Sequence, residues 1–321
     1  MSLCLYEPIR HKKLKLTIFH SIRQKNTFWY IIYKSATLIR MISFIIPTLN
    51  EEKYLPNLLD DLNRQTYRDF EVIVVDGGSE DKTVAVAQQF GNRLTLMVLT
   101  ANERNVSSQR NLGALRARSG WLIFMDADDR LPNYFLEGIK YRLLLTQADI
   151  FTCWLKPDSK RAGDGAFSTL FNLVLEGTRL TDIPAALGAL IGIKKSAFKK
   201  VGGFNPTIAF AEDRAFVQAA VKAGFRFRIF RDPQFIYSLR RFRTLGNLKV
   251  VQRYARLNLK RLTKAPIEPE EYPMGGNAFK GADEPTRRLL DKIQQYWIRM
   301  AKQPRVLKKL RALLEQVQDS V

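Results

Sequence analysis

The sequence predicts an α/β fold in which a doubly wound, mainly parallel sheet carries helices on both faces. From residue 42 onward, short runs rich in β-branched and aromatic residues alternate with longer stretches of helical periodicity, which is the order that βαβ units produce. Polar motifs follow several of these runs, at the position where an open α/β sheet binds its ligands. With 321 residues, 46% of them hydrophobic, the chain can build one large domain of this kind and an appended segment.

Strands and helices are expected to alternate through the first half of that domain. The expected strands are Ile42–Ile46, Phe70–Val75, Leu94–Leu99 and Trp121–Met125, and the helices between them are Tyr54–Gln65, Asp81–Phe90 and Ser107–Arg118. A proline in the first turn starts a further helix at Pro132–Leu145, which a strand at Asp149–Leu155 follows.

The pattern is less regular after residue 165. A helix is expected at 167–176, a strand near Ala189–Ile193, a tight turn at Gly202-Gly203-Phe204 and a helix from Glu212 to about Ala223. Four prolines and several glycines predict a loop or linker at residues 265–285. Two helices, at 286–301 and 305–318, are expected to close the chain.

The formal net charge of +21 is concentrated at the two ends of the chain. Residues 41–221 hold 21 basic and 21 acidic residues, whereas residues 1–40 hold 8 and 1, and residues 222–321 hold 23 and 9. We therefore expect a basic arm at 1–40, a folded α/β domain at 41–240 and a basic helical region at 241–321. Because the body is neutral and holds no recognised nucleic-acid-binding module, nucleic acid is not an expected partner.

The cysteine content and hydropathy of the sequence indicate the cellular compartment, and the positions of the histidines indicate which residue type can act as a general base. Cys4 and Cys153 are too few for a disulfide framework and lack the spacing of a zinc site, which favours a reducing, cytoplasmic setting. No apolar run reaches the ~18 to 20 residues that cross a bilayer, and the amino terminus lacks the features of a signal peptide. Met41, directly before the first strand, is an alternative start. Both histidines lie within residues 1–40, so a general base in the folded domain is expected to be a carboxylate.

Three carboxylates, Asp126, Asp128 and Asp129, follow the apolar run Trp121–Met125. Carboxylates at the end of a buried strand need a cation or another partner, because an unpaired buried charge is prohibitively costly. Mg²⁺ and Mn²⁺ suit carboxylate and water ligands, and Mg²⁺ sites commonly combine one or two carboxylates with substrate phosphates. The alternative is that the acids cap the next helix, but capping needs one acid, for which Asp129 is best placed. The sequence therefore predicts a divalent metal at this strand end.

Two glycine- or proline-containing motifs are expected at the same edge of the sheet. Pro47-Thr48-Leu49-Asn50-Glu51-Glu52 follows the first strand, and a turn capped by Asn50 is its alternative interpretation. Asp76-Gly77-Gly78-Ser79-Glu80-Asp81-Lys82-Thr83 follows the second strand. Its glycines let the backbone approach a ligand, and Asp76 can accept from a nucleobase or a ribose hydroxyl. A plain turn, with Ser79 or Asp81 as the helix cap, is equally compatible.

A third motif, Arg104-Asn105-Val106-Ser107-Ser108-Gln109-Arg110-Asn111, leads into a helix. Its two arginines can meet phosphate oxygens or pair with the neighbouring carboxylates; a solvated helix face is the alternative interpretation. The chain contains neither a P-loop nor a GxGxxG dinucleotide motif.

Taken in order, these motifs resemble those of the family 2 glycosyltransferases, which have the GT-A nucleotide-diphospho-sugar transferase fold. The resemblance runs from about Met41 to Tyr237 and rests on I-P-T-L-N-E-E, V-V-D-G-G-S-x-D-x-T, R-N-x-G, F-M-D-A-D-D, G-G-F and E-D. It implies that Asp128 ligates a Mn²⁺ or Mg²⁺ ion, that Asp126 lies near the metal or the ribose, and that Asp213, preceded by Glu212, is the catalytic base. The resemblance also implies that Pro47, Thr48, Asn50, Glu51 and Asp76 line the nucleotide pocket, with Asp76 near the base. Together with the motif residues above and the basic run near residue 240, the donor-binding residues that we predict are Pro47, Thr48, Asn50, Glu51, Asp76, Gly78, Ser79, Arg104, Arg110, Asn111, Asp126 and Arg241.

The implied chemistry is transfer of a sugar from a nucleotide-diphosphate donor to a sugar or lipid-linked acceptor, for a cell-surface glycan or glycolipid. A cation neutralises the leaving diphosphate, and a base on the opposite sugar face takes the acceptor proton, which inverts the sugar carbon. Gly77 stands where the family often has a second Asp. The Gln-x-x-Arg-Trp motif of processive synthases is absent, so transfer of a single sugar is expected. The alternatives are a sugar-nucleotide nucleotidyltransferase and a non-catalytic basic scaffold on lipid or nucleic acid.

Residues 222–264 hold 13 Lys and Arg against one Asp. A last core strand is expected to end just before the run Leu239-Arg240-Arg241-Phe242-Arg243. Arginine forks there suit a diphosphate or lipid phosphate. A helix expected from Leu245 to Thr263 has a basic stripe beside an apolar one, as helices at an anionic membrane interface do. This pattern adds a peripheral position on the cytoplasmic face of a membrane as an expectation; packing of the apolar stripe on the body is the alternative. The basic stripe consists of Lys249, Arg253, Arg256 and Lys260, and the apolar stripe of Leu248, Val251, Ala255, Leu259 and Leu262.

Overall fold

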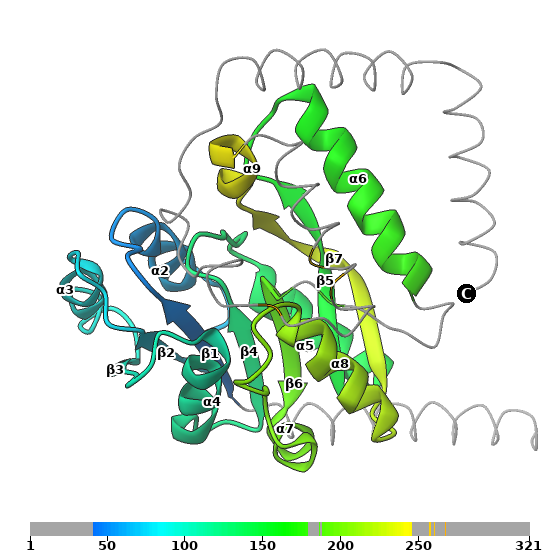
Figure 1. The fold of residues 1–321 in the computed structure, drawn as a ribbon, viewed down its shortest axis with the longest axis horizontal. Coiled ribbons are helices and arrows are strands. Elements are labelled where there is room, and N and C mark those ends of the chain that lie inside the picture. The colour runs from blue at the N-terminus through cyan, green and yellow to red at the C-terminus, as the bar shows by residue number, and fades with distance from the viewer. Residues whose placement is uncertain are drawn as a thin grey trace, which may run out of the picture.

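The computed structural model describes residues 41–178 and 188–245, together with residues 186, 257, 260 and 267. These residues form a seven-stranded sheet with helices on both faces (Figure 1). The strands lie in the order β3-β2-β1-β4-β6-β5-β7. The strands are β1 (Ile42–Thr48), β2 (Phe70–Asp76), β3 (Leu96–Thr100), β4 (Trp121–Met125), β5 (Ile150–Pro157), β6 (Leu190–Lys194) and β7 (Phe227–Tyr237).

The sheet is mainly parallel, as the sequence predicts. Strands β3, β2, β1 and β4 are mutually parallel neighbours, and so are β5 and β7, whereas β6 runs antiparallel between β4 and β5. The carboxyl ends of the six parallel strands therefore meet at one edge, while β6 ends at the opposite edge.

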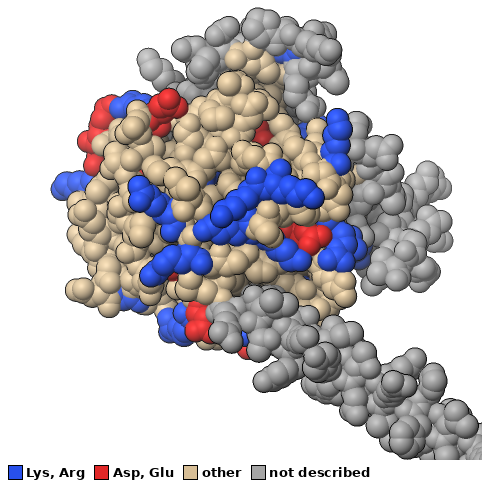
Figure 2. Space-filling model, turned by 90° about the horizontal axis from the view of Figure 1, so that it is seen from below, with Lys and Arg blue, Asp and Glu red and all other residues tan. Residues whose placement is uncertain are grey.

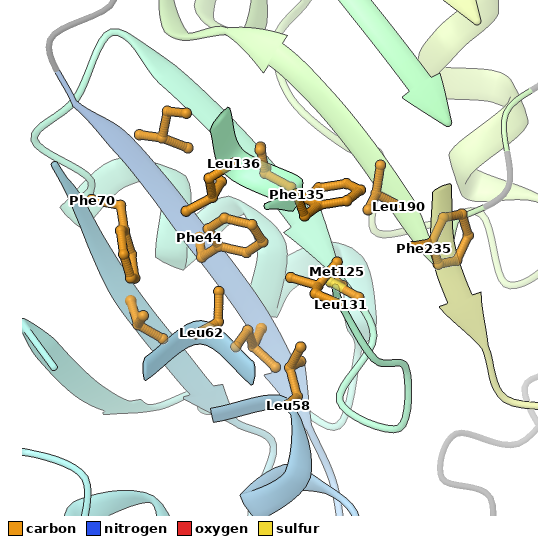
Figure 3. Close-up of a cluster of buried hydrophobic side chains, with 14 of the residues drawn as sticks. Phe44, Leu58, Leu62, Phe70, Met125, Leu131, Phe135, Leu136, Leu190 and Phe235 are labelled. Atoms are coloured by element: carbon orange, nitrogen blue, oxygen red, sulfur yellow. The ribbon is translucent and has the colours of Figure 1, made fainter. Parts of the chain in front are cut away.

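Two hydrophobic clusters occupy the two faces of the sheet, because successive side chains of a strand point to opposite faces. Phe44 and Ile46 of β1 belong to the first cluster, and Ile45 belongs to the second. Figure 3 shows part of the first cluster, in which Phe44 lies between side chains of α2 and α5. This face is covered by α2 (Leu55–Asn63), α3 (Thr83–Gln88), α5 (Phe135–Thr146) and α6 (Ala162–Gly177). The second is covered by α4 (Val106–Arg116), α7 (Lys195–Val201) and α8 (Glu212–Lys222).

Most expected elements of residues 42–223 are present, with boundaries shifted by a few residues. Helix α6 begins at Ala162 rather than at residue 167, and α7 is a helix that the sequence pattern did not predict. The expected turn at Gly202-Gly203-Phe204 is confirmed, since both glycines have positive φ angles of 89° and 78°. Such angles are easily adopted only by residues that lack a Cβ.

Helix α9 (Arg240–Leu245) is the last described helix. The helix expected at Leu245–Thr263 and those expected at 286–301 and 305–318 lie almost entirely outside the described residues, as does the arm at 1–40. None of the helices in the described part of the chain is long and apolar enough to cross a membrane.

Candidate active site

The loops that follow β1 and β2 bind each other at the carboxyl edge of the sheet. The backbone N–H of Asn50 donates to Ser79 Oγ, and that of Glu80 donates to Asn50 Oδ1, both at 2.8 Å. The backbone N–H of Glu51 donates to Thr83 Oγ1 at 2.8 Å. Asn50 adopts a positive φ of 56°, a conformation that Asn tolerates better than most residues. Two motifs that the sequence separates by some thirty residues therefore form one rigid unit.

Asp76 organises the second of these loops. Its Oδ2 accepts from the backbone N–H groups of Gly78 and Ser79 at 2.9 and 2.8 Å, and its Oδ1 accepts from Thr48 Oγ1 at 3.2 Å and from the Ser79 hydroxyl. The residue is 2% exposed. The structure thus brings together Thr48, Asp76, Gly78 and Ser79 of the predicted donor site in one hydrogen-bonded turn.

Gln109 is a contributor to this edge that the sequence did not single out. Its Nε2 donates to the carbonyl oxygens of Thr48 and Val75, both at 2.8 Å, and so ties α4 to the ends of β1 and β2. A Cβ at Gly77 would lie 2.9 Å from the same Nε2. This contact gives a physical reason for the glycine at the position where the family often carries Asp. A helical glutamine carries no distinguishing sequence signal, although it lies within the third motif.

Two other donor-site candidates of the third motif make protein contacts in this structure. Arg104 donates to Glu80 Oε1 at 2.5 Å and to the carbonyl of Gly78 at 3.2 Å, beside the Asp76 turn. Both polar atoms of the Asn111 amide bind the backbone of Phe204, at 2.8 and 2.9 Å. Asn111 therefore holds the glycine turn at 202–204 against α4, and its contact with a donor stays a prediction.

Arg110 is buried at the centre of the site, with 3% of its side chain exposed. Its Nη1 donates to Glu212 Oε1 at 2.9 Å, and its Nη2 donates to Asp126 Oδ1 at 3.2 Å and to the carbonyl of Gly188 at 3.0 Å. Of the two roles weighed from the sequence, the structure gives Arg110 the pairing with carboxylates. One guanidinium thus links the acid that ends β4 to the acid that begins α8.

Asp213 lies next to Glu212 in the first turn of α8. Burial, and next the charge of Glu212, raise the pKa of Asp213 to about 7, while the charge of Arg110 acts in the opposite direction. Its Oδ1 accepts from the backbone N–H of Arg214 at 2.6 Å. A Cβ at Gly188 would lie 2.8 Å from Asp213 Oδ2, so the close approach of that backbone requires glycine. Gly188 was not predicted, because it falls in the irregular region of the sequence.

A second arginine joins the other predicted acids. Arg240, at the start of α9, donates to both carboxylate oxygens of Glu51 at 2.9 and 2.7 Å, and lies 3.1 Å from Asp128 Oδ2. Its guanidinium stacks 4.1 Å from the ring centroid of Tyr54. The sequence predicts Arg241, rather than Arg240, as the donor-binding arginine of this run. The positive charge of Arg241 also acts on Asp128, in the direction that lowers its pKa.

Asp129 does not cap the helix that follows it. Its side chain is buried and accepts from the backbone N–H of Ser238 at 2.8 Å, whereas α5 begins after Tyr134. The bond connects the end of β4 to the chain beyond β7, so this acid fixes the position of the two segments that carry Asp128 and Arg240.

The residues present fit a divalent cation. Among the described residues, no group of three or more Asp, Glu, His or Cys side chains could hold a metal ion. Asp126 and Asp128 nevertheless supply two carboxylates with side chains 40% and 20% exposed, and Mg²⁺ sites often need no more from the protein when substrate phosphates complete them. Burial and then Asp126 raise the pKa of Asp128 against the effect of Arg240, and burial likewise raises the pKa of Glu51. The negative charge of Asp126 acts on Asp128, and that of both acts on Glu51; this mutual repulsion of carboxylates favours a bound cation.

Comparison with known proteins matches residues 43–202 to the family model for glycosyl transferase family 2. The chain belongs to this family. A PGL/p-HBAD biosynthesis glycosyltransferase of Mycobacterium tuberculosis is 43% identical to this family member over 93 residues, or 28% of the chain and 36% of the relative. The poly(ribitol-phosphate) beta-N-acetylglucosaminyltransferase TarS of Staphylococcus aureus is 27% identical over 206 residues, or 62% of the chain and 35% of that protein. The chain therefore spans about a third of the length of these relatives.

Solved structures show the same GT-A fold. S. aureus TarS 1-349, in complex with UDP-GlcNAc, matches with a TM-score of 0.51 and 24% identity over 62% of this chain and 58% of that one. The mannosyltransferase PcManGT from Pyrobaculum calidifontis, in complex with GDP-Man and Mn²⁺, matches with a TM-score of 0.55 and 20% identity over 83% and 79%. At these identities the likeness establishes the fold alone.

Proposed function

We propose that this family 2 member is a metal-dependent, inverting glycosyltransferase that moves a single sugar from a nucleotide-diphosphate sugar to an acceptor hydroxyl. One observation carries the proposal. Arg110 connects Asp126, at the end of β4, with Glu212, beside Asp213, through hydrogen bonds of 3.2 and 2.9 Å. Arg110 thereby holds the carboxylate proposed to act on the leaving group, Asp126, and the neighbour of the proposed base, Glu212, at the same edge of the sheet.

Asp213 is the base of the proposed reaction. A pKa of about 7 allows this carboxylate to take a proton near neutral pH. The acceptor hydroxyl gives its proton to Asp213 while its oxygen forms the bond to the sugar carbon. The bond from that carbon to the diphosphate oxygen breaks on the opposite face, so the configuration inverts. Asp126 and Asp128 would hold the metal, which supplies neutralisation of the charge that develops on the leaving diphosphate.

The donor lies, in this proposal, over the interlocked loops after β1 and β2. Thr48, Asn50, Asp76 and Ser79 are held there by their mutual hydrogen bonds, so little ordering remains to be done on binding. A nucleotide-sugar donor is further supported by the solved GT-A structures, which carry UDP-GlcNAc and GDP-Man.

The number of sugars transferred, the acceptor and the location are inferred from the sequence, the relatives and the cysteines. Transfer of a single sugar is supported by the absence of the Gln-x-x-Arg-Trp motif. A cell-surface glycan or glycolipid acceptor is supported by the names of the relatives, one of which acts on poly(ribitol-phosphate). A cytoplasmic location is supported by the low cysteine content: the chain has two cysteines, and Cys153 is buried and forms no disulfide.

The test is a screen of UDP, GDP, CDP and dTDP sugars, with and without Mn²⁺, by thermal shift, since a ligand that binds the folded state raises its apparent stability. A metal-dependent shift with one donor is expected, followed by transfer with inverted anomeric configuration in NMR spectra of the product. Asp213→Asn should abolish transfer and leave the nucleotide-induced shift nearly intact. A retained anomeric configuration, or turnover by Asp213→Asn, would refute the mechanism. Release of pyrophosphate from a sugar phosphate and a nucleoside triphosphate would indicate a nucleotidyltransferase instead.

A further inference from the structure

A basic surface lies at the edge of the sheet opposite the candidate active site (Figure 2). The amino ends of the parallel strands meet there with the carboxyl end of β6, as the pairing of Ile42 with Trp121 and of Trp121 with Lys194 shows. Helix α4 ends at this edge, and the side chain of Lys195, in the first turn of α7, donates to the carbonyl of Ala117 just beyond α4. Figure 1 shows α4 and α7 at the lower end of the molecule, away from α9.

Basic side chains dominate this edge. Figure 2, seen from that side, shows Lys and Arg gathered across the middle of the face, with few acidic residues among them. We call this surface the basic face and define it by Arg116, Arg118, Lys194, Lys195, Lys199, Lys200, Lys222 and Arg226. Glu71 pairs with Arg118, and Asp149 pairs with Lys194 and Arg226. Asp69, exposed directly before β2, lies at the same edge. Three carboxylates thus stand against eight cations, and the face keeps a positive excess.

Helix geometry explains only part of this excess. Arg116, Lys199, Lys200 and Lys222 lie in the last turns of α4, α7 and α8, where a cation interacts favourably with the helix dipole. The remaining four cations lie on a strand end, on loops or at a helix start, where the dipole gives no such reason. A cluster of one sign on one face is instead what attracts a polyanionic surface.

Two observations favour a membrane over nucleic acid as that surface. Leu115, directly before Arg116, is 74% exposed, the largest value among the exposed large hydrophobic residues of the described part of the chain. The sequence that precedes β1, residues 1–40, contains 8 basic residues, 1 acidic residue and the largely apolar stretch Phe28–Ile39, which Lys34 interrupts. Basic charge combined with exposed apolar side chains suits the interface of an anionic bilayer. The phosphate backbone of a nucleic acid has no apolar layer in which such side chains could be buried.

We infer that the basic face docks on an anionic bilayer. The carboxyl edge of the sheet then points away from the bilayer by the length of β1, seven residues or roughly 20 Å. This inference concerns attachment alone and does not depend on the proposed glycosyl transfer.

The test is flotation of the full chain with vesicles of phosphatidylcholine alone and with vesicles containing 30% phosphatidylglycerol, at low and high salt. The wild-type protein should float only with the anionic vesicles and should be released by salt, because the attraction is screened within about 10 Å at 0.1 M salt. Lys199→Glu combined with Lys200→Glu should reduce the bound fraction by at least about tenfold. Leu115→Asp should reduce it further.

The matched control is Lys160→Glu combined with Arg161→Glu. This pair changes the net charge equally but lies after β5, at the opposite edge. The control should float like the wild type, and both double variants should keep the wild-type melting temperature. Equal losses in the two double variants, undiminished flotation of the Lys199/Lys200 variant, or no flotation at low salt would each overturn the inference. So would binding to duplex DNA in preference to anionic vesicles.

Discussion

Replacing Arg110 with methionine is the sharpest test of the central ion network, because it removes the charge and keeps most of the side-chain volume. Glu212, whose side chain is 12% exposed, would lose its partner inside the protein, and breaking a buried pair in this way costs about 3 to 5 kcal/mol. Asp126 is 40% exposed, so water screens it and its share is about 0 to 1 kcal/mol. We expect a loss of about 4 kcal/mol in the free energy of unfolding, measured by urea denaturation with an unchanged m-value.

The same substitution should shift the pH dependence of activity. The positive charge of Arg110 lowers the pKa of Asp213, which burial and Glu212 raise to about 7. A base must be unprotonated to act, so the rate falls as the pH drops through this pKa. Removing Arg110 favours the protonated form, raises the pKa of Asp213 and moves the acidic limb of the kcat/KM profile to higher pH.

Arg110→Lys is the matched control, since it keeps the charge and loses the forked hydrogen bonds. Its acidic limb should stay close to that of the wild-type protein even if its rate is lower. If the limb of Arg110→Met does not move, Asp213 is not the group that titrates. If both variants shift alike, geometry rather than charge is the cause.

Three further predictions follow from close contacts and pairs elsewhere in the fold. Gly188→Ala places a methyl group 2.8 Å from Asp213 Oδ2; because small misplacements of catalytic groups cost about 10²-fold, kcat should fall by that order with little change in melting temperature, and a normal kcat would refute the contact. Gly192→Ala places a Cβ 2.1 Å from the ring of Phe151, so overpacking should cost about 1 to 3 kcal/mol in urea denaturation; an unchanged midpoint would contradict the packing. Two basic partners lower the pKa of Asp149 to about 2 against the effect of its burial. Its pairing therefore stabilises the protein above the unfolded-state pKa of about 3.9 and is lost as the pH falls through about 2. Asp149→Asn should cost about 1 to 2 kcal/mol at pH 7, discounted because the partners are exposed, and the difference should vanish in titrations toward pH 2.

The positions of the acids could be predicted because the local hydrophobic pattern shows where each strand ends. The apolar run Trp121–Met125 is found as β4 at the predicted residues, and an acid that follows a parallel strand must lie at the carboxyl edge. Asp76 and Asp126 were therefore expected at one edge from hydrophobic pattern alone. The antiparallel direction of β6 left no such local sign, since a five-residue apolar strand reads the same in either direction.

The sequence offers Arg110 as a partner for the neighbouring carboxylates, but which acids it pairs with could not be predicted, because each pair depends on how distant elements pack. Arg110 and Glu212 are 102 residues apart and meet through the placement of α4 and α8 on the same face of the sheet. The choice between Arg240 and Arg241 depends on helical phase, since neighbouring residues of a helix point about 100° apart. A sequence shows that arginines are available near a strand end, but only the packed structure shows which of them reaches a carboxylate.

The pairing pattern has a mechanical consequence that neither motif suggests alone. Each predicted metal ligand pairs with one arginine, and each arginine also pairs with a second acid: Arg110 with Asp126 and Glu212, and Arg240 with Asp128 and Glu51. The carboxylates after β4 are therefore linked through one arginine to the start of α8 and through the other to the loop after β1. Charged pairs tolerate little separation in a low-dielectric site, and the pairs of Arg110 with Glu212 and of Arg240 with Glu51 are the buried ones, with no side chain more than 12% exposed. The two arginines therefore hold the start of α8 and the loop after β1 most firmly, while water screens the pair with Asp126.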